Sequence, residues 1–162
     1  MRRLLVVLSL TVAVAGTLLV TTAGATAPAG VTNGCRYLKL SEVNRITGLT
    51  FVKGKNPPSP SPLTACGYVL TDDPTTVVNL WVQPKPQTAL AFKTAKEAFA
   101  DSAEPVTGLG KKAFYAGEGV NTVYVLKGDT FVFVQYLALG NDDTAGVKDA
   151  TVKMTKLVTG RV

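Results

Sequence analysis

The sequence has 162 residues, no histidine, two cysteines and a formal net charge of +6. Without histidine, a Ser–His–Asp triad, a Cys–His dyad and a histidine-ligated zinc site are all excluded, so we expect no metal and no cofactor. The Lys and Arg residues are scattered and are not interleaved with aromatic residues, so nucleic-acid binding is not expected either.

The N-terminal region has the three parts of a secretory signal peptide. Arg2 and Arg3 are followed by an apolar run over residues 4–20 and then by small residues that end near Ala25 or Ala27. A retained transmembrane anchor is the alternative, but the run is barely long enough to cross a bilayer.

We therefore expect a signal peptide over residues 1–27, a flexible lead-in over 28–34 and one secreted domain over 35–162. Loss of the two N-terminal arginines leaves 15 basic and 11 acidic residues. This mild basicity is compatible with attraction to an anionic cell surface. No membrane span is expected after cleavage of the signal.

The two cysteines predict a structural disulfide. In an exported chain, Cys35 and Cys66 most simply pair with each other and close a loop of about thirty residues, worth roughly 3.5 kcal/mol in the chain-entropy model. A catalytic or metal-binding cysteine is the competing interpretation, but the chain offers no histidine as its partner.

The first half of the domain predicts a short helix followed by a hairpin. Ser41 can cap the helix and Gly48 can end it. The proline-rich segment 57–62 cannot continue a helix or a central strand, so it is expected to be an extended surface loop. Residues 66–70 and 75–83 are strand-like and are joined by a turn.

Two further helices are predicted from their apolar periodicity. The helix over residues 88–100 carries an inward stripe of Phe92, Ala95 and Phe99. Another short strand is expected near residues 113–115. The C-terminal helix begins near Thr144 and has a stripe formed by Val147, Ala150, Met154, Leu157 and Val158.

The clearest pattern lies in residues 122–139, which predict a β-hairpin. If Gly128 and Asp129 form its two-residue turn, Gly128 supplies the positive φ of a type II′ turn. Leu126 then pairs with Phe131, and Tyr124 pairs with Phe133. Neither face of this hairpin alternates with polar residues, so both strands should be central in a sheet that is covered on at least part of both faces.

The predicted order of elements is α-β-β-α-β-β-β-α. This order indicates an α+β fold with a mainly antiparallel sheet of about five strands and with helices packed on one face. The face of the central hairpin that the helices cover stays open at this point.

Several short motifs carry a resemblance to a known family. They are Cys35-Arg36-Tyr37-Leu38, Cys66-Gly67-Tyr68 and the Gly-Leu-Gly turn within 108–113. Together they resemble a family of actinobacterial secreted proteins and lipoproteins catalogued as a domain of unknown function. Members often carry an acidic residue where this chain has Lys111 and a tryptophan where it has Tyr68. The resemblance implies no activity, cofactor or catalytic residue.

A binding surface is the favoured kind of site, and we do not expect an enzyme. Asn79, Trp81 and Gln83 share one face of a strand, where amide and aromatic side chains can contact a sugar, peptide or glycan. The competing interpretation packs Trp81 under the second helix or a loop. The sequence thus favours a non-catalytic secreted or cell-envelope module that binds an unknown ligand or protein.

Two other functions are retained as alternatives. The loop over residues 57–62 could act as a protease inhibitor or as a polyproline ligand. A histidine-free hydrolase would need two carboxylates brought together across a cleft.

Overall fold

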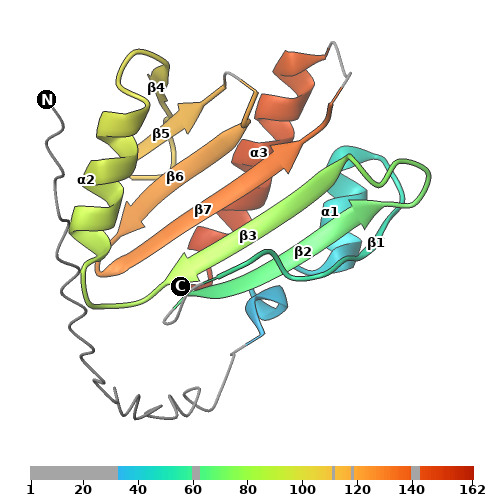
Figure 1. Ribbon diagram of the computed structural model, residues 1–162, viewed down its shortest axis with the longest axis horizontal. Helices are drawn as coiled ribbons and strands as arrows, with labels where there is room; N and C mark the ends of the chain where they lie inside the picture. The colour runs from blue at the N-terminus through green and yellow to red at the C-terminus, as the bar shows by residue number, and fades with distance from the viewer. Residues whose placement is uncertain (1–32, 60–62, 111, 118, 140–142) are drawn as a thin grey trace, which may run out of the picture.

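The computed structural model describes residues 33–59, 63–110, 112–117, 119–139 and 143–162 (Figure 1). The expected signal peptide and most of the lead-in lie outside these ranges. Asn33 and Gly34, which were expected in the lead-in, belong to the folded region, because Asn33 caps the 3-10 helix η1 (Gly34–Arg36) and Gly34 is buried against Ala65. Among the described residues, no helix combines the length and apolar character needed to cross a membrane.

The described residues form an α+β fold around one antiparallel sheet of seven strands rather than about five. The order across the sheet is β1-β2-β3-β7-β6-β5-β4. After β3 the chain leaves the centre through helix α2, reaches the far edge, and returns strand by strand until β7 pairs with β3 (Figure 1). The strand bounds are β1 Phe51–Lys53, β2 Thr64–Leu70, β3 Val77–Gln83, β4 Ala103–Pro105, β5 Ala113–Ala116, β6 Thr122–Lys127 and β7 Thr130–Leu137.

The two strands that the predicted order lacks are the edges of the sheet. Strands β1 and β4 have three residues each, too few to show an alternating pattern. Strand β1 is a strand only through its antiparallel pairing with β2, in which Phe51 lies opposite Leu70. Strand β4 pairs with β5 and ends at Pro105. An edge strand tolerates proline, which has no backbone N–H, because the backbone groups on its outer side have no neighbouring strand to bond.

The predicted central hairpin is confirmed together with its register. Leu126 lies opposite Phe131 and Tyr124 lies opposite Phe133. Gly128 has a φ of 55°, the left-handed value that the turn requires.

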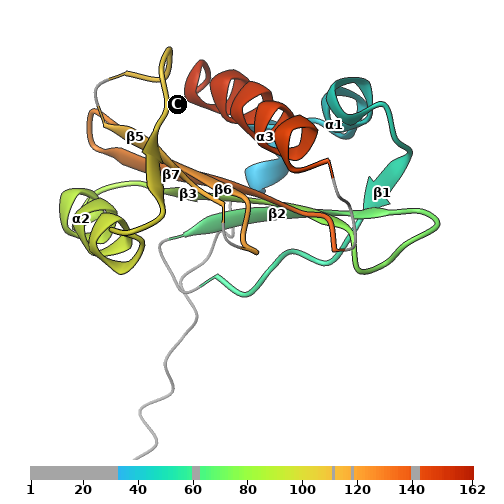
Figure 2. The ribbon, with the colours of Figure 1, turned by 90° about the horizontal axis from the view of Figure 1, so that it is seen from above.

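Helices cover both faces of the sheet, so the prediction of helices on one face is wrong. Helices α1 (Leu40–Thr47) and α3 (Thr144–Thr159) lie on one face, and α2 (Thr88–Ala98) lies on the other (Figure 2). An apolar stripe shows which side of a helix turns inward, but it does not show which face of a sheet the helix meets.

The main core lies between the sheet and the pair α1 and α3. Met154 of α3 is fully buried there, next to valines of the central strands and Leu38. Leu157, which was expected in the same stripe, is only half-buried. The buried side of α3 is formed by Val147, Ala150, Thr151, Met154, Thr155, Val158 and Thr159.

The predicted disulfide is confirmed. Cys35 of η1 and Cys66 of β2 have their sulfur atoms 1.95 Å apart and their Cα atoms 5.0 Å apart. The bond fixes the start of the described fold to the middle of a strand 31 residues later.

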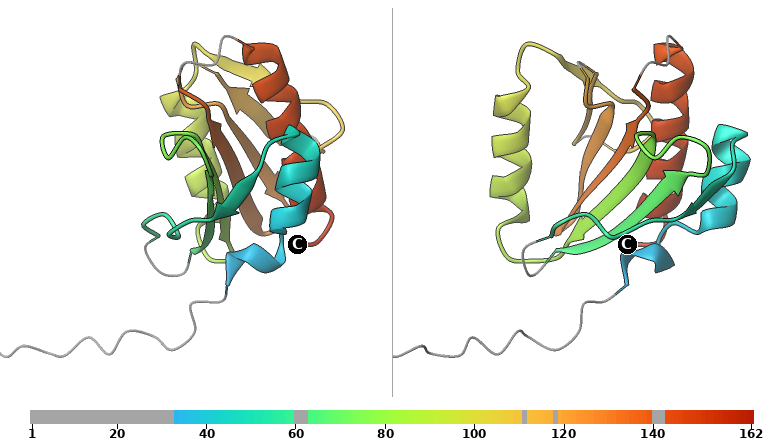
Figure 3. Two further views of the ribbon diagram at one scale, coloured as in Figure 1. Left: turned by 90° about the vertical axis from the view of Figure 1, so that its right-hand side faces the viewer. Right: turned by 45° about the vertical axis from the view of Figure 1, so that its right-hand side comes forward.

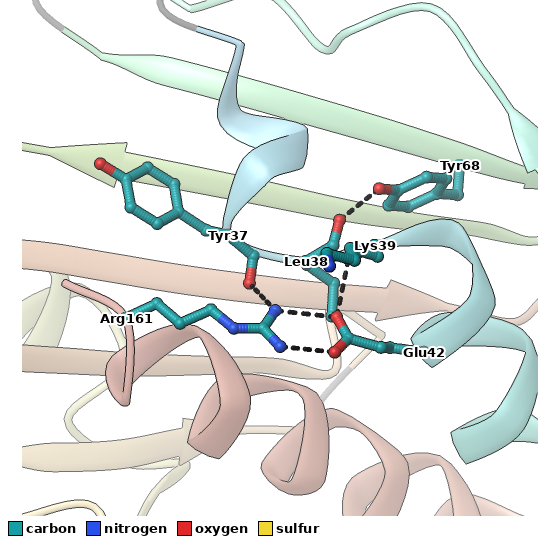
Figure 4. Close-up of polar contacts among 6 residues, drawn as sticks. All are labelled: Tyr37, Leu38, Lys39, Glu42, Tyr68 and Arg161. Carbon is teal, nitrogen blue, oxygen red and sulfur yellow. Dashed lines mark hydrogen bonds and ion pairs between the residues drawn. The ribbon is translucent and has the colours of Figure 1, made fainter.

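A second link joins the two ends of the described fold (Figure 4). The guanidinium of Arg161, just after α3, makes a bidentate contact with Glu42 of α1, at 2.5 and 2.8 Å. Arg161 also donates to the carbonyl of Tyr37, and Glu42 accepts from the N–H of Lys39. The hydrogen bonds from Arg161 are the largest cause that lowers the pKa of Glu42 to about 2.

This link predicts a loss of stability in acid. The pKa of Glu42 is lower in the folded protein than in an unfolded chain, so its contribution is complete above about pH 4.5 and disappears as pH falls toward 2. The carboxyl side chain is 17% exposed and the guanidinium is 34% exposed, so we expect roughly 1–3 kcal/mol. Urea unfolding of Glu42→Gln and of the unchanged protein, measured from pH 7 to pH 2, should show this difference at pH 7 and convergence near pH 2.

The matched control is Glu97→Gln, because Glu97 is 65% exposed and pairs with Lys93 at 3.7 Å. It should change stability by less than about 0.5 kcal/mol at every pH. A difference for Glu42→Gln that did not change with pH would contradict this account of the link.

Candidate ligand-binding site

The sheet face that α2 covers carries a row of four aromatic side chains. Trp81 of β3, Phe133 of β7, Tyr124 of β6 and Phe114 of β5 lie directly opposite one another across neighbouring strands. The centroids of successive rings are 4.8, 5.8 and 4.8 Å apart, and their planes are nearly parallel. We call these four residues the aromatic row.

Helix α2 crosses only one part of this face (Figure 3). Phe92 meets the edges of Phe114 and Phe131 at centroid distances of 5.5 and 6.0 Å, and Phe99 lies 5.6 Å from Tyr124. These contacts hold the helix to strands β5, β6 and β7. The three residues of the predicted inward stripe, Phe92, Ala95 and Phe99, are each half-buried, but α2 ends at Ala98, so Phe99 lies just beyond the helix.

A groove of about 480 Å³ lies between α2 and the sheet. Three aromatic side chains of the sheet form one wall, and small residues of α2 form the other. Leu90 is 61% exposed, a large exposure for a leucine. The lining residues are Gln87, Leu90, Ala91, Thr94, Ala95, Ala98, Tyr124, Phe131 and Phe133.

The three residues predicted as the site share one face of β3, and each is half-buried. Asn79 donates from Nδ2 to Oε1 of Gln135 at 3.3 Å. Trp81 donates from Nε1 to the carbonyl of Pro58 at 3.4 Å. Gln83 lies opposite Phe131 in the strand register. Two of the three therefore use polar groups within the protein.

The groove beside α2 is not formed by the three predicted residues. None of Asn79, Trp81 and Gln83 lines the groove beside α2, although Trp81 borders it through its stacking contact with Phe133. The sequence-based site missed Tyr124, Phe131, Phe133 and the helix wall. The aromatic face of the predicted hairpin was the signal that could have identified the sheet side of the groove.

The segment before the proline-rich stretch also lies on this sheet face. A side chain at Gly67 of β2 would have its Cβ 2.3 Å from the carbonyl oxygen of Lys55, so only glycine lets that segment pass so close. Together with the contact between Trp81 and Pro58, this places a loop over the β2 end of the row. Residues 60–62, which complete the proposed inhibitory loop, lie outside the described residues.

A cavity of about 500 Å³ on the other face bears on the hydrolase alternative. Its lining includes Glu104, Tyr115, Asn121 and Lys148. Glu104 is the sole carboxylate among these described lining residues, and it forms an ion pair with Lys148 at 2.5 Å. The described ranges contain no group of three or more His, Cys, Asp or Glu side chains that could hold a metal ion.

Neither a protein-family model nor a curated protein sequence matches this chain, and no solved structure matches it either. The resemblance to the actinobacterial family of unknown function therefore stays a prediction.

Proposed function

We propose that this protein is a non-catalytic binding module that holds an apolar ligand in the groove between α2 and the aromatic row. The observation that supports this most directly is the groove itself, in which Tyr124 and Phe133 remain only half-buried beneath a helix that lies across them. Its volume of about 480 Å³ falls within the range usual for small-molecule sites.

The helix wall explains why the groove stays open. Ala91, Ala95 and Ala98 occur at spacings of four and three residues, so they lie on the same side of α2. Alanine side chains leave space above the rings that leucine or phenylalanine would fill. An apolar ligand would gain free energy by covering the ring faces that the alanines leave accessible.

The arrangement of polar groups favours an apolar ligand over a sugar. A sugar needs several hydrogen-bonding groups directed into its site, whereas the amide of Asn79 and the indole N–H of Trp81 bond to other parts of the protein. The Tyr124 hydroxyl is neutral at physiological pH, as tyrosine usually is, and burial raises its pKa further. Gln87 and Thr94 are the other polar lining residues.

The location we propose is extracellular or in the cell envelope. The disulfide between Cys35 and Cys66 supports this proposal, because such bonds persist in oxidising compartments. An apolar ligand would fit that setting, where lipids and their fragments are abundant.

The test uses Trp81, the only tryptophan, as an energy donor. The uncharged fluorophore N-phenyl-1-naphthylamine should bind in the groove and emit when Trp81 is excited. Leu90→Asp should weaken this binding about tenfold, because it removes an apolar rim and adds a charge.

Leu139→Asp is the matched control. Leu139 is 59% exposed, close to the exposure of Leu90, but it lines a different cavity. It should leave the affinity for the fluorophore unchanged. The proposal fails if Trp81 transfers no energy to the fluorophore, or if the two substitutions weaken binding equally.

A further inference from the structure

Helices α1 and α3 lie side by side on the face of the sheet opposite the aromatic row (Figures 2 and 3). A groove of about 520 Å³ runs between them. Among the described residues, its lining consists of four basic side chains, two aliphatic ones and a glycine, and none of these is acidic. We call this set the basic helix surface: Arg45, Ile46, Lys153, Lys156, Leu157, Gly160 and Arg161.

Two of the four cations have no ion-pair partner among the described residues. Arg161 is paired with Glu42, and Lys153 is paired with Asp149 at 2.6 Å. Arg45 and Lys156 are exposed and form no such pair within the part of the chain that the structure describes. The surface therefore keeps an excess of positive charge after its internal pairs are counted.

The charges lie beside apolar side chains that the protein buries only in part. Ile46 and Leu157 are half-buried in the groove, and Ile46 also packs against the rim of the main core. Leu49, just after α1, is 41% exposed and lines the adjoining cavity together with Ile46. An aliphatic strip flanked by cations complements a partner that presents both negative charge and hydrocarbon.

We propose that the basic helix surface docks the protein on an anionic lipid bilayer. Arg45 and Lys156 contact lipid phosphates, while Ile46 and Leu157 lie against the upper part of the acyl chains. Two features favour a bilayer as the occupant: the unpaired cations match its anionic headgroups, and the aliphatic strip matches the apolar layer beneath them. The docking does not depend on the proposed ligand groove, which lies on the opposite face and would point away from the lipid.

The test is flotation of the full-length protein with vesicles of phosphatidylcholine, with or without phosphatidylglycerol. Binding should be stronger with the anionic lipid than without it, and this difference should shrink as salt is raised. Arg45→Gln combined with Lys156→Gln should lower the vesicle partition coefficient by about 25-fold, or about fivefold for each cation. The apolar run over residues 4–20 is common to all variants, so the comparison between them isolates the helix surface.

The control combines Lys93→Gln with Lys96→Gln, which removes the same charge from α2 on the other face. Both lysines are exposed. This variant should keep the partition coefficient of the unchanged protein. Equal losses in the two double variants would show a general charge effect and would overturn the proposal.

Side-chain footprinting with a carbene reagent gives a second readout that the N-terminal run does not disturb. On anionic vesicles, labelling of Ile46 and Leu157 should fall while labelling of Leu90 stays constant. The proposal is overturned if none of these sites changes. It is overturned equally if only free lysophosphatidylglycerol protects Ile46 and Leu157, or if their protection follows dimerisation without lipid.

Discussion

Replacing Met154 by alanine is expected to lower the free energy of unfolding by about 2–5 kcal/mol, the range for truncating a large apolar side chain in a core. Met154 has no exposed surface and belongs to the apolar cluster between α3 and the sheet. The loss combines the removed apolar contacts with the cavity left behind. Urea unfolding followed by circular dichroism measures it, because the sheet and α3 should unfold together.

Leu157→Ala is the matched control on the same helix. The side chain of Leu157 is half-buried in the groove beside α1, so its truncation should cost less than about 1.5 kcal/mol. The periodicity of the sequence predicts that both residues are buried, so the two substitutions should then cost similar amounts. The structure buries only Met154 fully, so it predicts a larger loss for Met154→Ala. A larger loss for Leu157→Ala than for Met154→Ala would mean that α3 turns a different side toward the sheet.

Removing the disulfide through Cys35→Ala and Cys66→Ala together is expected to cost about 3.5 kcal/mol. The bond joins residues 31 positions apart, and a cross-link that closes a loop of that length lowers the entropy of the unfolded chain and so raises its free energy by about this much. Cys66 is also fully buried, so the substitution removes some packing as well. The midpoint of guanidinium unfolding of the oxidised protein should fall accordingly in the double variant.

Reduction of the unchanged protein gives an independent control. Dithiothreitol should lower its stability almost to that of the double variant and should have no effect on the variant itself. After denaturation without a reductant, treatment with iodoacetamide should add no mass to the protein, as measured by mass spectrometry. Two reactive thiols in the untreated protein would contradict the disulfide.

The sequence predicted local pairings more successfully than the outline of the sheet. The register of the hairpin around Gly128 follows from the length of its turn, which a short stretch of sequence contains completely. The pairing of the two cysteines followed because no third cysteine competes. Strands β1 and β4 were missed because three residues cannot show a period, and each exists only through a neighbouring strand.

For the candidate site, too, the sequence predicted local features but not contacts between distant parts of the chain. The sequence correctly placed Asn79, Trp81 and Gln83 on one face of a strand. It could not show that Asn79 would meet Gln135, 56 residues later, because that contact depends on the pairing of β3 with β7. The hydrogen bond of the Asn79 amide results from that distant pairing, and the groove results from the face of the sheet on which α2 packs.

The position of β3 has a consequence for the chain as it is synthesised. Strands β1 to β3 form one antiparallel ribbon and β4 to β7 form another, and the two join only where β3 meets β7. Val77 pairs with Leu137, so one edge of β3 has no partner until nearly all of the second ribbon has been made. An open strand edge offers unpaired backbone donors and acceptors to any other extended chain. This edge of β3 is therefore where we expect a nascent molecule to be most prone to aggregate.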